Sequence, residues 1–230
     1  MQISRQLPSI TFLPAGKSRK NKTDRKRRIG MVTGRDPATA LPPALSGQAA
    51  TFPFMTAPDD LLRRIETEPA LADLLNWPGD FDVTRRDPVE ELRLPTGMPL
   101  HPIAGCAAGG TYFLCGEPGT RRPVLYADSE GQASLIGEDL TEAITLIAAF
   151  PYWQDLGLGF PVEELEADML DDQPDFDESR DRLLSALGLT PPPAADALAR
   201  LRAAAERTAP DFVPASVEHG LPYGLLFSRD

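Results

Sequence analysis

The chain has 230 residues and a net charge of −11, with 42% hydrophobic and 25% charged residues, a composition typical of a folded globular protein. Two cysteines in a chain of this length exclude a disulfide scaffold. No apolar run approaches the length of a membrane span, and residues 1–16 lack the cationic start and long apolar core of a secretory signal, so we expect a cytoplasmic protein.

The charge is divided unevenly along the chain. Residues 1–35 contain ten Lys or Arg and one acid, whereas the remaining residues contain 13 bases and 33 acids, a net charge of −20. All four lysines of the chain lie in the basic segment: Lys17, Lys20, Lys22 and Lys26. Two explanations are open. The segment precedes a natural start at Met31 or Met55, which the lysine distribution favours, or it is a basic arm that binds nucleic acid or an acidic partner.

Residues 1–56 have neither helical nor strand periodicity, so we predict a basic, Pro/Ala-rich arm without regular structure. An acidic folded domain is expected over residues 57–230. Its first helices are predicted within residues 58–76, where Pro58-Asp59-Asp60 places acids in a first turn and Pro69 restarts the helix. Residues 80–98 show no clear pattern.

The centre of the chain predicts a β core at about residues 100–137. Four short β-prone segments separated by turns that contain Gly favour an antiparallel meander. These segments are residues 100–106, 111–115, 123–127 and 132–136. A helix over residues 139–150 follows, with Asp139 or Thr141 as its cap.

The C-terminal third is predicted to be helical. The expected helices are residues 161–172, 178–187 and 194–207, and residues 221–227 are a candidate edge strand. The predicted fold class is therefore α+β, an antiparallel β-meander packed by helices with a helical C-terminal extension.

No phosphate-binding motif is present. Gly105, Gly109 and Gly110 lie between two predicted strands, but no Gly-Lys-Ser/Thr follows and no helix begins there. A turn or bulge that requires glycine dihedral angles is the favoured interpretation.

The candidate metal and catalytic groups are few. His101, Cys106 and Cys115 match no common zinc spacing, and the acids within residues 171–177 lack the Gly and terminal Glu of an EF-hand loop. His219 is the second of only two histidines, and no nucleophile elbow is present. We expect no catalytic residue, no metal and no cofactor. Paired carboxylates nonetheless leave a carboxylate- or metal-dependent enzyme as an alternative.

Residues 163–181 contain ten acids and one base, Arg180. Such a segment is most often a solvated helix face, but it also suits a basic protein partner. Tyr152 and Trp153 form an aromatic pair that is either core packing, the commoner case, or a recognition pair. The candidate partner-binding residues are Glu163, Glu164, Glu166, Asp168, Asp171, Asp172, Asp175, Asp177, Tyr152 and Trp153.

The order of elements between residues 100 and 156 is distinctive. A strand precedes Gly109-Gly110-Thr111-Tyr112-Phe113, then comes Pro123-Val124-Leu125-Tyr126-Ala127-Asp128-Ser129-Glu130-Gly131, a short strand and a helix with a terminal aromatic. This order resembles the core of the SMI1/KNR4 (SUKH) superfamily, in which a Gly-Gly-aromatic strand leads to a Val-x-Tyr-x-Asp-x-x-x-Gly-like hairpin and a helix. The similarity covers about a quarter of the chain. The family's N-terminal strand and Leu-Pro-containing helix have no clear counterpart.

The resemblance implies a non-enzymatic binding domain. Bacterial members are similar to immunity proteins that neutralise toxin domains, often nucleases, by direct binding. Nucleases tend to be basic, so an acidic domain suits such a partner, and the Arg-, Ala- and Pro-rich composition fits a GC-rich bacterial genome. Nucleic acid is expected to bind only through the N-terminal arm, because the acidic domain repels phosphate. A structural scaffold is the other alternative.

Overall fold

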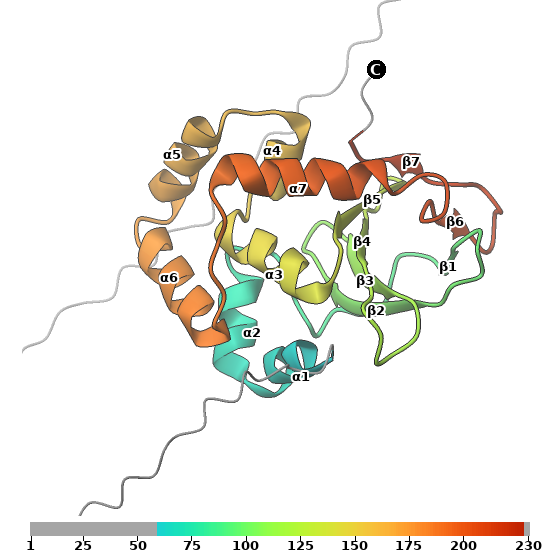
Figure 1. Cartoon of the computed structure of the whole chain (residues 1–230), viewed down its shortest axis with the longest axis horizontal. Helices are drawn as coiled ribbons and strands as arrows, with labels where there is room; N and C mark the ends of the chain where they lie inside the picture. The colour runs from blue at the N-terminus through green and yellow to red at the C-terminus, as the bar shows by residue number, and fades with distance from the viewer. Residues whose placement is uncertain (1–58, 228–230) are drawn as a thin grey trace, which may run out of the picture. The chain divides into compact units, whose positions relative to one another are not determined.

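The computed structural model of the chain describes residues 59–227 (Figure 1). The predicted arm at residues 1–56 and both candidate start sites lie outside the described residues. Within residues 59–227 no helix has the length and apolar character needed to cross a membrane.

The α+β class is confirmed by the helices and strands of this part of the chain. The helices are α1 (Asp60–Thr67), α2 (Pro69–Asn76), α3 (Leu140–Ala149), α4 (Trp153–Leu158), α5 (Val162–Asp172), α6 (Phe176–Leu187) and α7 (Ala194–Glu206). The strands are β1 (Leu92–Arg93), β2 (Leu100–Gly105), β3 (Thr111–Cys115), β4 (Val124–Ala127), β5 (Gln132–Gly137), β6 (Ala215–Ser216) and β7 (Gly224–Leu225). No pattern predicted α4, β1 or β6.

The main sheet has five strands in the order β2-β3-β4-β5-β7. Strands β2 to β5 are consecutive antiparallel neighbours, whereas β7 pairs with β5 in parallel through Gln132 and Ala133. Beyond that short pairing, Thr208 follows α7 along the edge of β5, and its hydroxyl accepts a hydrogen bond from the Leu135 backbone N–H at 2.9 Å. Backbone hydrogen-bonding groups at the edge of β5 therefore find partners both in a strand, β7, and in a side chain, that of Thr208.

The two faces of the sheet support two separate apolar clusters. Tyr112, Leu114 and Tyr126 join the cluster that α1, α2, α3, α4, α6 and α7 cover. The alternate residues Phe113 and Leu125 face a smaller cluster, closed by residues near β1 and after α7. This division follows from the period-two alternation of side chains along a strand.

The C-terminal helices are part of the main core rather than an appended extension. Leu183 and Leu184 of α6, together with Ala197 and Leu201 of α7, are buried in the same cluster as α3. Helix α5 differs, because none of its residues is buried. An amphipathic pattern shows that one helix face needs cover, but it does not specify which element supplies that cover.

A row of aromatic rings runs through the main core. The ring centroids of Phe81, Tyr112, Tyr126 and Trp153 lie 5.0, 4.9 and 5.2 Å apart in succession. The row explains Gly110, since a Cβ atom there would overlap the Tyr126 hydroxyl and lie 2.6 Å from its Cζ. Gly109 has a φ of +89°, which supports the turn interpretation of the Gly-Gly pair.

Candidate functional site

The candidate partner-binding carboxylates gather on α5 and the start of α6. Helix α5 follows Pro161 and carries Glu163 and Glu164 in its first turn, where the helix dipole favours negative charge. We call the exposed carboxylates of this region the acidic face: Glu163, Glu164, Asp168, Asp171, Asp172, Asp175 and Asp177.

Almost none of this charge is balanced inside the domain. Asp177 forms an ion pair with Arg180 at 2.8 Å, and Arg180 also lies over the Phe176 ring, 5.0 Å from its centroid. The other six side chains of the acidic face form no ion pair or hydrogen bond within the described residues. Helix α5 contacts the core only through partly buried side chains such as Leu165 and Met169. The acidic face is thus a solvated surface with uncompensated negative potential.

Two of the candidate residues, Tyr152 and Trp153, are not on the surface. Their exposed fractions are 7% and 1%, and Trp153 packs edge-on against Tyr126 in the core. The hypothesis of an aromatic recognition pair is therefore wrong, because neither ring is accessible to a partner. The sequence placed both residues near a helix end, but only the fold shows that both point inward.

Glu166 has a structural contact that distinguishes it from the acidic face. It is half-buried, and its carboxylate accepts a hydrogen bond from the Tyr152 hydroxyl at 3.3 Å. Burial and the neighbouring Glu166 carboxylate raise the pKa of Tyr152 well above its ordinary value, so the phenol stays a donor. This bond attaches α5 to the segment that begins α4.

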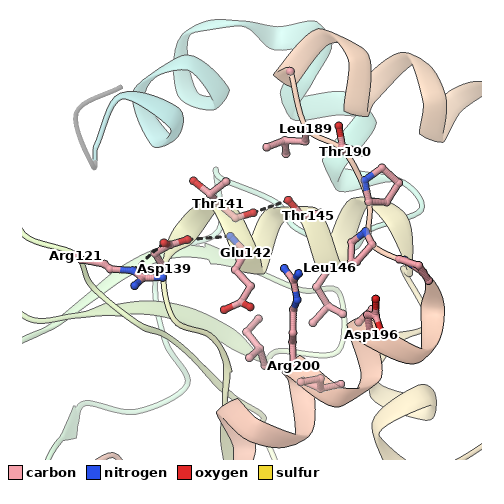
Figure 2. Close-up of a pocket in the computed structure, with 17 residues that line it drawn as sticks. Arg121, Asp139, Thr141, Glu142, Thr145, Leu146, Leu189, Thr190, Asp196 and Arg200 are labelled. Carbon is pink, nitrogen blue, oxygen red and sulfur yellow. Dashed lines mark hydrogen bonds and ion pairs between the residues drawn. The ribbon is translucent and has the colours of Figure 1, made fainter. Parts of the chain in front are cut away.

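A cavity of about 680 Å³ lies between α3, the connection from α6 to α7, and the start of α7 (Figure 2). Its apolar lining includes Ile136, Leu146 and Leu201, and residues 191–193 form a wall of three prolines. No sequence pattern predicted this cavity.

Charged side chains also line the cavity, and some of them form ion pairs whereas others do not. Arg121 pairs with Asp139 at 3.0 Å and with Glu138 at 3.1 Å, while Asp139 caps α3 by accepting the Glu142 N–H at 2.9 Å. Arg200 extends from α7 into the cavity toward α3 in Figure 2, and it forms no ion pair or side-chain hydrogen bond within the described residues.

The remaining titratable candidates do not assemble into a site. Among residues 59–227, no group of three or more His, Cys, Asp or Glu is placed to hold a metal ion. The two cysteines belong to clusters on opposite faces of the sheet, Cys106 in the main core and Cys115 in the smaller one. Burial raises the pKa of the Cys115 thiol to about 12, which keeps it protonated and unreactive at neutral pH.

No protein-family model, no curated protein and no solved structure matches this chain. The function is therefore inferred from the geometry of the chain's own residues and from the resemblance at residues 100–156.

Proposed function

We propose that this chain is a non-enzymatic, cytoplasmic protein-binding domain whose acidic face docks a basic protein. The observation that carries the proposal is that seven exposed carboxylates share the surface of α5 and the start of α6, and one of them has a cation within the domain. The resemblance to the SMI1/KNR4 (SUKH) superfamily supports a basic toxin domain, such as a nuclease, as the partner.

The carboxylates of the acidic face repel one another. Like charges on one surface raise the free energy of the folded domain, and cations from a partner would remove that repulsion on binding. The same field accelerates encounter with a basic protein and makes association sensitive to ionic strength. Because α5 has no buried residue, packing does not account for its acidic sequence.

The test compares two variants of the full chain with the same change in net charge. The face variant carries Glu163→Gln, Asp168→Asn, Asp171→Asn and Asp172→Asn. The control variant carries Glu117→Gln, Glu130→Gln, Asp211→Asn and Glu218→Gln, which are exposed acids elsewhere with no side-chain partner within the described residues. Each form is used to capture proteins from the native lysate, and the captured protein is then purified for calorimetric titration.

We expect the wild type and the control variant to bind the same basic protein with similar affinity, weakened by salt. The face variant is expected to lose at least tenfold in affinity, since each removed rim charge contributes a few tenths to about 1 kcal/mol. Equal affinities of the face and control variants would show that only the net charge of the chain affects binding, and would reject the acidic face as the docking surface. Failure of every form to retain a basic protein would reject the partner class.

A further inference from the structure

We propose that the cavity between α3 and α7 is a binding site for a small monocarboxylate with an apolar body, and that Arg200 is the residue that binds its carboxylate. This site is separate from the acidic face and does not depend on the proposed protein-binding role. Its volume, about 680 Å³, falls within the range of about 300–1,000 Å³ typical of small-molecule sites.

The sign of the charge expected on a ligand follows from which charged side chain of the cavity has no counter-charge. Arg121 is balanced by Asp139 and Glu138. Glu142 lies in the first turn of α3, where the helix dipole stabilises it, and its Oε2 accepts the Glu138 backbone N–H at 2.7 Å. Asp196 lies in the first turn of α7 and has the same dipole stabilisation.

Arg200 has no such compensation. It lies in the middle of α7, away from either helix end, and no acid lies within ion-pair distance of it in the described residues. Figure 2 shows its guanidinium in the cavity, drawn between the side chains of Glu142 and Leu146. A guanidinium presents its donors as a planar fork that matches a carboxylate in a bidentate arrangement. The group that best complements Arg200 is therefore an anion.

The surrounding acids select a single negative charge. Asp139, Glu142 and Asp196 all line the cavity, so a phosphate dianion would meet more repulsion than a carboxylate. Ile136 and Leu146 form the floor of the cavity, and their exposed fractions are 1% and 6%. An apolar part of the ligand would contact these two side chains.

The cavity walls supply rigidity and further hydrogen bonds. Pro193 has a φ of −51° and a ψ of 146°, the extended geometry of a polyproline segment, which keeps this wall preorganised. The hydroxyl of Thr190 also lines the cavity and makes no hydrogen bond within the described residues. It is available to a polar group elsewhere on the ligand.

The experiment is an amide-resolved NMR titration of the full chain with four probes. Hexanoate tests a free small carboxylate, and N-acetylleucine tests the carboxylate of a peptide end. Hexylamine and inorganic phosphate test the opposite charge and the dianion. We expect saturable shifts at Leu146, Thr190 and Ala197 with one or both carboxylates, and weaker or no shifts with hexylamine and phosphate. The better carboxylate identifies the source of the ligand.

Arg200→Gln and Arg202→Gln are the matched variants. Both arginines are exposed on α7, two residues apart, but Arg202 does not line this cavity. Arg200→Gln is expected to weaken carboxylate binding at least about tenfold, the effect of losing a charged hydrogen bond, whereas Arg202→Gln leaves it unchanged. Shifts with hexylamine or phosphate as strong as with the carboxylates would overturn the proposal. So would equal binding by Arg200→Gln and wild type, or the absence of saturable shifts with both carboxylates.

Discussion

Helix α5 and the aromatic core meet at Tyr152, whose ring is buried in the main cluster and whose hydroxyl donates to Glu166 on α5. On the core side the rings of Tyr112, Tyr126 and Trp153 pack closely, and Gly110 is needed to make room for them. On the α5 side no residue is buried, and most carboxylates have no partner.

The difference separates two kinds of constraint on the sequence. Core residues are chosen by volume and contact, so substitutions there change the free energy of unfolding. Residues of the acidic face make few contacts, so substitutions there are expected to change association and leave folding almost unaffected. The following predictions test this contrast, from the largest expected effect to the smallest.

The two tryptophans provide the sharpest test. Trp153 is 1% exposed and Trp77 is 64% exposed. We expect Trp153→Ala to lower the free energy of unfolding by about 4 kcal/mol, through lost burial and the cavity left behind. Trp77→Ala should change it by no more than about 0.5 kcal/mol. Urea unfolding followed by circular dichroism measures both, and equal costs would contradict the burial of Trp153.

The second test concerns the close contact at Gly110. Gly110→Ala is expected to cost about 3 kcal/mol, because the new Cβ forces the Tyr126 ring against its neighbours. In a Tyr126→Phe background the same substitution should cost less, since the hydroxyl that meets the Cβ is gone. Urea unfolding of the four proteins in this double-mutant cycle gives the coupling free energy between positions 110 and 126. Additive effects would show that the Tyr126 hydroxyl is not the source of the cost.

The third test uses the ion pair between Arg122 and Asp59, which attaches the start of α1 to the loop before β4. Burial opposes the charge of Asp59, but the hydrogen bonds from Arg122 and the Gly119 N–H outweigh it and lower the pKa of the carboxyl. A lowered pKa in the folded state contributes stability above the unfolded value of about 3.8, and that stability is lost as pH falls through the folded pKa.

We therefore expect Asp59→Asn to cost about 2 kcal/mol at neutral pH, because Arg122 is only 6% exposed and loses its counter-charge. The difference from wild type should shrink as the pH falls below the unfolded pKa of about 3.8 and then through the lower folded pKa of Asp59. Urea unfolding across this pH range measures the effect, with the exposed Asp211→Asn as control. A difference that stays constant with pH would show that the Asp59 charge does not contribute.

The smallest effect on folding is expected for the acidic face. The four-residue face variant described above should change the free energy of unfolding by less than about 1 kcal/mol, and in the stabilising direction at low salt, because it removes repulsion. Thermal unfolding at low and moderate salt measures this change against the control variant. A large loss of stability would mean that these carboxylates have structural contacts.

Much of the local structure was predictable from the sequence. The ends of β3 at Thr111 and Cys115 and the restart of a helix at Pro69 were predicted, and Asp139, which caps α3, was one of two candidate caps. These features are local, because residue type and spacing over a few positions determine turns, caps and strand alternation. The uneven distribution of charge, and therefore the acidic face as a candidate surface, also came from the sequence.

The tertiary structure decided what no local pattern contains. Only the fold shows that Trp153 points into the core, that α6 and α7 complete that core, and that β7 pairs in parallel with β5. Strands of two residues, such as β1 and β6, have no periodicity to detect. The cavity with Arg200 arises because α3 and α7, about fifty residues apart along the chain, lie on either side of it. A residue's polarity determines whether it needs burial, whereas the partner that buries it depends on contacts distant in sequence.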